Sequence, residues 1–384
     1  MSKRKICVVI INRANYARSK SILEAVKKHP GLQLQLVVGS STLLYRFGNA
    51  VDVIRKDGFK PDMIMYSIVE GENPVTMAKS TGLALIELTS IFDNLKPDMV
   101  VTIADRFETI STAISASYMN IPLAHVQGGE VTGSIDETVR HAVTKLSHIH
   151  FPSTKASRKR IIMMGETGNR VFTVGCPSID LAANLACTLD DVRTRHEKSG
   201  VGGSIDFTKP YILVVQHPVT TEYGLALEQI NETAKAVAMS GMQAIWLWPN
   251  VDAGSDDIAK GLRIFREKFN HPFIRYYRNF PPEEYLALLK NAKCIAGNSS
   301  SGIREGAYLG VPCVNIGTRQ NGREMGKNVI CAGYNHKQIL KAMRFQIAHG
   351  KYPSNKLYGD GKAGMRIADI LARIDVKIQK KLSY

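Results

Sequence analysis

The sequence predicts an α/β protein built from two doubly wound, Rossmann-like halves that face each other across a cleft. Short apolar runs alternate with helix-length segments through most of the chain, which is typical of parallel sheets covered by helices. The alternation stops in a charged and then glycine-rich stretch at 181–207 and restarts after it. With 384 residues the chain has room for more than one core. We therefore expect a first domain at 1–180, a linker at 181–207, a second domain at 208–360 and a closing C-terminal helix at 361–384.

The first half shows this alternation element by element. Its expected strands are the apolar runs at 6–11, 34–38, 99–103, 123–126, 149–151 and 171–174. Helix-length segments lie between them at 19–28, 77–95 and 106–118. Because a helix returns the chain to the start of the next strand, the strands should run parallel.

The second half repeats the pattern. Its expected strands are 211–215, 244–247, 273–276, 293–296 and 313–316. Its expected helices are 224–239, 257–268, 282–291 and 303–309. The amphipathic tail at 361–382 predicts a helix that closes the fold.

Composition excludes several classes of protein. A hydrophobic fraction of 44% and a mean hydropathy of −0.10 are typical of a soluble globular chain. No apolar run reaches the ~20 residues that a membrane span requires, and the basic N-terminus leads directly into a short strand. We expect a cytoplasmic protein with no membrane partner. Six scattered cysteines without a C-x-x-C pair favour reduced, buried thiols and indicate no metal site.

The net charge of +16 raises the question of nucleic-acid binding. The lysines and arginines are spread along the chain and lack interleaved aromatic residues, so an acidic small substrate fits them better than nucleic acid does. Neither half carries G-x-G-x-x-G after a strand, and no Walker A motif is present. The sequence therefore predicts no cofactor, and a bound nucleotide would be part of the substrate.

The most informative motif is the polar hinge at 297–305, between an apolar run and a helical segment. Its hydroxyls, on Ser299 and Ser300, would lie beside the free N–H groups of a helix N-terminus, which attract phosphate. Glu305 could reach a ribose hydroxyl from the first turns of the helix, and Arg319 follows the next strand. An ordinary helix cap is the alternative. Together these residues predict a site for a nucleotide-diphosphate sugar.

Candidate catalytic groups follow two strands of the first half. Asp105 and Arg106 come shortly after 99–103, where doubly wound sheets place their ligands, although a capping Asp beside a surface Arg is the alternative. The next strand leads into a glycine-rich loop that contains Gln127, Glu130 and Asp136. Glycines let the backbone approach a sugar, and carboxylates on such a loop suit general acid–base catalysis.

Three further strand ends carry polar residues. Arg13 and Arg18 follow the first strand and are candidate diphosphate contacts. In the second half, His217 and Asn250 occupy corresponding strand ends. A histidine beside an apolar strand is often structural, but the expected cleft gives His217 a functional alternative.

Taken in order, these motifs resemble the UDP-N-acetylglucosamine 2-epimerase family, in particular its hydrolysing branch, which supplies sialic-acid-type pathways. The matching stretches cover nearly the whole chain: Asn-Arg-Ala-x-Tyr at 12–16, Asp-Arg-Phe at 105–107, Gly-Gly-Glu-Val-Thr-Gly-Ser-Ile-Asp at 128–136, Arg-His-Ala-x-Thr-Lys-Leu-Ser-His at 140–148, Gly-Cys-Pro-Ser at 175–178, Gln-His-Pro-Val-Thr at 216–220, Pro-Asn-x-Asp-Ala-Gly at 249–254, Gly-Asn-Ser-Ser-x-Gly-x-Arg-Glu at 297–305 and Gly-Thr-Arg-Gln-x-Gly-Arg-Glu at 317–324.

The resemblance implies a glycosyltransferase-B-like fold and a two-step reaction without metal or nicotinamide. UDP leaves C1 of the sugar as the C2 proton is removed, which gives a glycal. Water then adds with inverted configuration at C2 and releases 2-acetamido-mannose and UDP. By position, Asp105 and Asp136 correspond to acid/base residues of the family, and His217 to a catalytic or phosphate-adjacent histidine. The nucleotide-binding positions correspond to Arg13, Asn250, Ser299, Ser300, Glu305 and Arg319.

The chain departs from the family pattern His-x-Glu-Gly-Gly-Glu at Gln127. An amide cannot act as a general base at neutral pH, although it can orient a water or a sugar hydroxyl. Either Glu130 takes the role, or Asp105 and Asp136 suffice, or the substrate differs. The main alternative substrate is a UDP- or GDP-2,4-diacetamido-6-deoxy sugar of the legionaminic acid pathway. A glycosyltransferase that needs an acceptor and a sensor that binds without turnover are further alternatives, and the apolar helix at 77–95 suggests a homo-oligomer.

Overall fold

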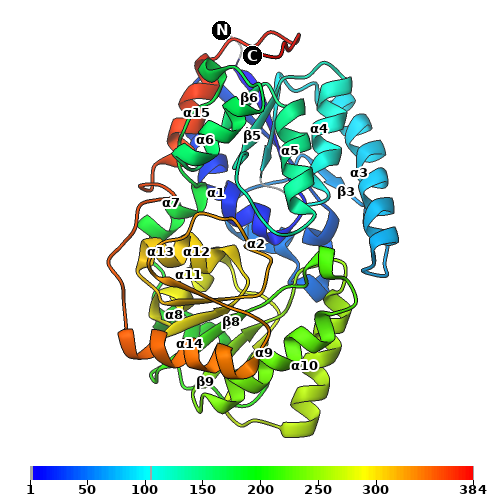
Figure 1. Ribbon diagram of the computed structural model, residues 1–384. Coiled ribbons are helices and arrows are strands. Elements are labelled where there is room, and N and C mark those ends of the chain that lie inside the picture. The colour runs from blue at the N-terminus through cyan, green and yellow to red at the C-terminus, as the bar shows by residue number, and fades with distance from the viewer. Residues whose placement is uncertain (1–2, 104–105, 384) are drawn as a thin grey trace.

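Two sheets, each covered by helices on both faces, form the two halves of the protein. The computed structural model describes residues 3–103 and 106–383. In Figure 1 the first half lies above the second, and the chain returns at its C-terminus to the half where it began. The site of interest lies between the two sheets.

The first sheet has six parallel strands in the order β3-β2-β1-β4-β5-β6, which is the order of doubly wound nucleotide-binding folds. Its strands are β1 (Arg4–Ile10), β2 (Leu32–Gly39), β3 (Met63–Met65), β4 (Met99–Ile103), β5 (Leu123–Val126) and β6 (Ile149–Phe151). Its helices are α1 (Arg13–Lys28), α2 (Ala50–Lys56), α3 (Pro74–Leu95), α4 (Thr109–Tyr118), α5 (Asp136–Leu146) and α6 (Lys155–Met163), with 3₁₀ turns η1 (Ser40–Leu43), η2 (Tyr45–Phe47) and η3 (Gly168–Arg170).

The second sheet has seven strands in the order β13-β12-β11-β8-β9-β10-β7. Numbered from β8, its six parallel strands repeat the order of the first sheet, and β7 adds an antiparallel edge. Its strands are β7 (Val201–Gly202), β8 (Tyr211–Val215), β9 (Gln243–Leu247), β10 (Ile274–Tyr277), β11 (Cys294–Gly297), β12 (Cys313–Ile316) and β13 (Val329–Ala332). Its helices are α8 (Leu189–His196), η4 (Thr220–Glu222), α9 (Ala226–Met239), α10 (Ser255–Phe269), α11 (Pro282–Asn291), α12 (Ser300–Ile303), α13 (Glu305–Leu309) and α14 (His336–His349).

Side chains of the buried strands contribute alternately to two cores in each half, because successive residues of a strand point to opposite faces. In β1, Ile6 and Val8 pack toward α1, whereas Cys7 and Val9 pack toward α3 and α4. The second sheet divides in the same way between one core under α9, α10 and α14 and another under α8 and α11. These layers confirm the predicted α/β class with two doubly wound sheets.

One helix connects the halves, and the C-terminal helix packs back against the first half. Helix α7 (Pro177–Ala183) packs against both α1 and α13, and α15 (Ala363–Arg373) packs against α1, where Ile367 and Leu371 complete the first core. The stretch at 181–207, predicted as a linker, contains α8 and β7, and β7 pairs with β10. None of the helices within 3–103 and 106–383 is long and apolar enough to cross a membrane.

Several predicted elements were wrong in extent or type. The predicted strand 171–174 is an isolated bridge between Val171 and His150, and the predicted helix 303–309 is divided into α12 and α13 at Arg304, whose ψ is −76°. The predicted tail helix ends at Arg373. Helices α1 and α3 begin earlier than predicted, because Asn12 and Asn73 cap their N-termini. Strands β3 and β13 and helices α2, α6 and α14 were not predicted.

Candidate active site

A pocket lies between the two halves, at the strand ends where each sheet reverses its order. Such switch points lie between β1 and β4 in the first sheet and between β8 and β11 in the second, and they are where open α/β sheets bind ligands. The pocket has an empty volume of about 1120 Å³, open solvent at its mouth included. Of the residues predicted from sequence, its lining contains Arg13, Arg18, Arg106, His217, Asn250, Ser299, Ser300, Glu305 and Arg319.

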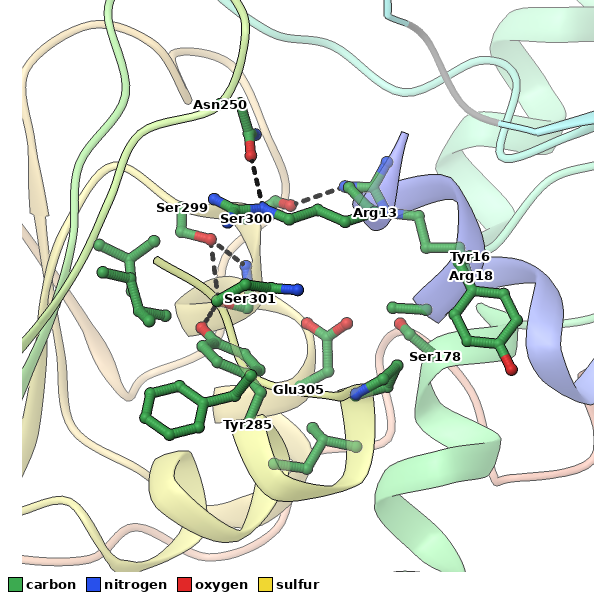
Figure 2. Close-up of a pocket in the computed structure, with 18 of the residues that line it drawn as sticks. Arg13, Tyr16, Arg18, Ser178, Asn250, Tyr285, Ser299, Ser300, Ser301 and Glu305 are labelled. Atoms are coloured by element: carbon green, nitrogen blue, oxygen red, sulfur yellow. Dashed lines mark hydrogen bonds between the residues drawn. The ribbon is translucent and has the colours of Figure 1, made fainter. Parts of the chain in front are cut away.

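One wall is the broken helix after β11. Ser299 caps α12, and its hydroxyl accepts a hydrogen bond from the backbone N–H of Ser301 at 3.3 Å. Figure 2 shows the carboxylate of Glu305 pointing from the start of α13 into the open space of the pocket. Its Oε2 atom is buried and has no hydrogen-bond partner among the described residues. A buried carboxylate oxygen of this kind suits a ligand hydroxyl.

The opposite wall is formed by the first two turns of α1. Arg13 donates through Nε to Asn250 Oδ1 at 3.0 Å and through a second nitrogen to the carbonyl of Trp248 at 2.8 Å. Arg18 donates to Ser300 Oγ at 3.0 Å, across the pocket. Figure 2 shows both arginines facing the serines of α12. The acceptors in these contacts are neutral amide, carbonyl and hydroxyl oxygens. None of these hydrogen bonds therefore pairs the positive charge of Arg13 with a carboxylate.

Arg106 lies deeper and is paired. Its guanidinium contacts Asp252 at 2.8 Å, and Nε contacts Glu108 at 3.3 Å, with all three side chains buried. Asp105, predicted as catalytic, lies outside the described residues. In the sequence it lies two residues after the end of β4 and directly before Arg106.

His217 is neutral at the floor of the pocket. Burial, followed by the charges of Arg319, Arg13 and Arg106, holds its pKa well below the usual value. Its Nδ1 accepts a hydrogen bond from the backbone N–H of Asn250 at 3.2 Å, which leaves the proton on Nε2. The site can therefore offer a neutral imidazole N–H donor near its cations.

The three candidate residues of the glycine-rich loop from 127 to 137 make different contacts. Asp136, in the first turn of α5, contacts the pocket residue Arg319 at 3.5 Å. Gln127 has a positive φ of 68°, and its amide donates to Cys176 Sγ at 2.7 Å. Glu130 contacts the guanidinium groups of Arg304 and Arg323, both from the second half. None of the three is among the residues that line the pocket, and Asp136 meets the lining through its contact with Arg319.

Sequence reasoning missed part of the site. The apolar wall comes from the segment after β10 and from α11, with Phe280, Pro281, Tyr285 and Leu286, and nothing in that segment stands out as a motif. Ser178, at the N-terminal end of α7, also lines the pocket and contacts Cys176 at 2.9 Å. The Gly-Cys-Pro-Ser stretch carried a signal for Ser178, but the residue was not selected.

Comparison with known proteins identifies the family. The sequence model of the UDP-N-acetylglucosamine 2-epimerase family matches residues 24–372. The chain belongs to this family. It is 34% identical to the UDP-N,N'-diacetylbacillosamine 2-epimerase (hydrolyzing) of Legionella pneumophila, over 98% of this chain and 97% of that protein. It is 31% identical to the UDP-N-acetylglucosamine 2-epimerase of Neisseria meningitidis, over 94% and 91%. These relatives confirm the resemblance to the hydrolysing branch.

Two further similarities bear on substrate and fold. The GDP/UDP-N,N'-diacetylbacillosamine 2-epimerase (hydrolyzing) of Campylobacter jejuni is 32% identical over 86% of this chain and 84% of that protein. The crystal structure of Methanocaldococcus jannaschii UDP-GlcNAc 2-epimerase in complex with UDP-GlcNAc and UDP superposes with a TM-score of 0.79 at 20% identity, over 96% of this chain and 99% of that chain. This likeness confirms the glycosyltransferase-B-like architecture of the epimerase family.

Proposed function

We propose that this protein is a hydrolysing UDP-N-acetylglucosamine 2-epimerase that releases N-acetylmannosamine and UDP. The observation that carries the proposal is the composition of the pocket. Arginines and a helix N-terminus surround it, a neutral histidine lies at its floor, and the loop with Asp136 meets it through Arg319. Cations favour the departing diphosphate, and carboxylates move the proton at C2.

In the first proposed step a carboxylate removes the proton from C2 while the C1–O bond breaks, and UDP leaves with the bonding electron pair. The product is 2-acetamidoglucal. In the second step water adds its oxygen to C1, and a proton returns to C2 from the opposite face. We assign the two proton transfers to Asp105 and Asp136, and the stabilisation of the leaving diphosphate to Arg13, Arg319 and the Nε2–H of His217.

We assign the nucleotide to the second half. The N–H groups at the start of α12, with Ser299 and Ser300, suit phosphate oxygens, and the unpartnered oxygen of Glu305 suits a ribose hydroxyl. Asn250, Arg18 and Arg106 complete the proposed binding set, in which Asn250 orients Arg13.

The alternative substrate is a UDP- or GDP-2,4-diacetamido-6-deoxy sugar. Two of the relatives named above are diacetylbacillosamine 2-epimerases, and their identities of 34% and 32% are comparable with the 31% to the UDP-N-acetylglucosamine enzyme. Under either substrate we propose a cytoplasmic role in supplying a sialic-acid-type pathway. A homo-oligomer is supported by apolar side chains on α3 that are exposed, among them Val75 and Ile86.

The test is incubation of the purified protein with each nucleotide-sugar in deuterated water, followed by proton NMR. Release of UDP and N-acetylmannosamine that carries deuterium at C2 would support the first substrate. If UDP-N-acetylglucosamine stays intact and a diacetamido sugar is released instead, the alternative holds. Asp105→Asn and Asp136→Asn should each abolish turnover and leave UDP binding intact. Full activity in both variants would refute the assigned mechanism.

A further inference from the structure

Glu130 is a buried carboxylate whose contacts come from the other half of the protein. Its side chain is 3% exposed, and its Oε2 atom accepts hydrogen bonds from Arg304 and from Arg323. Arg140, itself fully buried, donates to the backbone carbonyl of Glu130 at 2.8 Å. The carboxylate therefore lies within a cluster of guanidinium groups and away from the pocket lining.

Each of the two arginines is attached to the nucleotide side of the site. Arg304 stands between the serines of α12 and Glu305, at the break between α12 and α13. Arg323 follows Arg319 by four residues in the loop after β12. The two segments that we assign to nucleotide binding thus meet at one carboxylate of the first half.

The same loop is held at a second place. The backbone N–H of Gly133 donates to the carbonyl of Arg319 at 3.0 Å, and the hydroxyl of Thr221 donates to the carbonyl of Gly133 at 3.1 Å. Arg319 also contacts Asp136 at 3.5 Å. Glu130 and Asp136, six residues apart, therefore meet Arg323 and Arg319, four residues apart, across the boundary between the halves.

The chemistry of Glu130 does not suit proton transfer. Burial alone would raise its pKa, but the charges of Arg304, Arg323 and Arg140 lower it below the usual value. An ionised carboxylate whose Oε2 atom is shared by two guanidinium groups is a poor acid and a weakened base. Its Oε1 atom is buried and has no hydrogen-bond partner among the described residues, and Glu130 is not among the residues that line the pocket. Its geometry is that of an anchor.

We propose that Glu130 is a positioning residue, which holds the loop carrying Asp136 against the nucleotide-binding segments through Arg304 and Arg323. This role rests on the proposed function, because it matters for catalysis only if Asp136 acts on a ligand bound to those segments. A rigid anchor of this kind is needed because a displacement of about 1 Å in a catalytic group can cost about a hundredfold in rate.

The test compares Glu130→Gln and Glu130→Asp with the wild type. Glu166→Gln is the matched control, because Glu166 is also a buried carboxylate with several cationic partners, Lys145 and Lys380 among them, but lies outside the site. Two readouts are needed: hydrogen–deuterium exchange of 128–137 in the free protein, and kcat, KM and the pH–rate profile for UDP release. UDP affinity and Tm show that each variant is folded.

In Glu130→Gln, the amide hydrogens of 128–137 should exchange faster, and kcat should fall about ten- to a hundredfold. Both limbs of the pH–rate profile should stay where they are in the wild type. Glu130→Asp keeps the charge and should recover part of the rate, while Glu166→Gln should leave both readouts unchanged. Wild-type exchange or wild-type kcat in Glu130→Gln would overturn the proposal. So would a lost or shifted pH limb in either Glu130 variant, which would make Glu130 an acid or base. If the wild type does not turn over any of the nucleotide-sugars, the proposed function is rejected. Hydrogen–deuterium exchange of 128–137 would then still test whether Glu130 holds the loop in place.

Discussion

Gly133 is the point at which a single added methyl group should separate the glycine-rich loop, 127–137, from the second half of the protein. A Cβ atom added at Gly133 would lie 2.2 Å from the backbone carbonyl oxygen of Thr318, whereas ordinary contacts begin near 3.4 Å. The backbone on both sides is hydrogen-bonded, so relief by rotation of a side chain is not available. In Gly133→Ala the two segments must therefore move apart by about 1 Å.

The consequence falls on Asp136. Its contact with Arg319 is already 3.5 Å, and a further separation of this size breaks it and moves the carboxylate relative to the pocket. Because misplacement of a catalytic group by about 1 Å costs about a hundredfold, we expect kcat to fall by roughly that factor. UDP affinity should fall less than kcat, because Ser299, Ser300 and Glu305 lie on other segments and Arg319 is the proposed diphosphate contact on the displaced one.

The assay is UDP release under saturating substrate, with UDP affinity measured by calorimetry. Gly82→Ala is the matched control, because its added Cβ, on α3, would have no described atom within 4 Å. That variant should keep the wild-type kcat and gain up to about 1 kcal/mol of helix stability. Wild-type kcat in Gly133→Ala would refute the reasoning, because it would show that the loop tolerates displacement from the second half.

Three further predictions concern single carboxylates. Glu305→Ala should weaken UDP binding about ten- to a hundredfold by calorimetry, because a hydrogen bond to a charged group contributes about 1.5–3 kcal/mol; an unchanged affinity would exclude Glu305 from the nucleotide site. Burial and a hydrogen bond with Asp256 raise the pKa of Glu72 from 4.5 to about 7. The folded protein keeps this proton to higher pH than the unfolded chain, so stability falls as pH rises from about 4.5 to 7, and Glu72→Gln should flatten Tm against pH over that window. Burial would raise the pKa of Glu166, but neighbouring histidine and lysine side chains lower it to about 2. The stability that ionised Glu166 contributes is present above pH 4.5 and is lost as pH falls toward 2. Glu166→Gln should therefore reduce the fall of Tm between pH 4.5 and 2. The same fall of Tm in the variant as in the wild type would contradict this prediction.

Several polar residues that line the pocket could be predicted because a parallel fold concentrates them. His217, Asn250 and Ser299 each follow a short buried strand, and the carboxyl ends of parallel strands meet at one edge of a sheet. A short stretch of sequence therefore contains both the strand and the polar residue that the strand positions at the edge of the sheet. The same logic failed for the apolar wall, since Phe280 and Leu286 look like ordinary core residues until the fold places them beside the cleft.

Pairings across the halves could not be predicted. Glu130 and Arg304 are separated by 174 positions, and Arg106 meets Asp252 across a similar gap. No periodicity links such residues, because their contact depends on how two sheets pack together. The unpredicted strand β13 has a related cause. It is a half-exposed edge strand whose pairing with β12 carries little apolar signal.

The structure also gives a physical account of Gln127. Its amide donates to Cys176 Sγ at 2.7 Å and accepts from Arg304 at 3.5 Å, and Arg304 is the arginine that holds Glu130. A neutral side chain at this position can join the cluster around Arg304 without competing with Glu130 for its charge. Of the three candidate groups on the loop, Asp136 alone contacts an arginine of the pocket lining in the described chain. We therefore propose that Asp136 and Asp105 make the proton transfers, and that the amide at 127 belongs with the anchor that holds the loop in place.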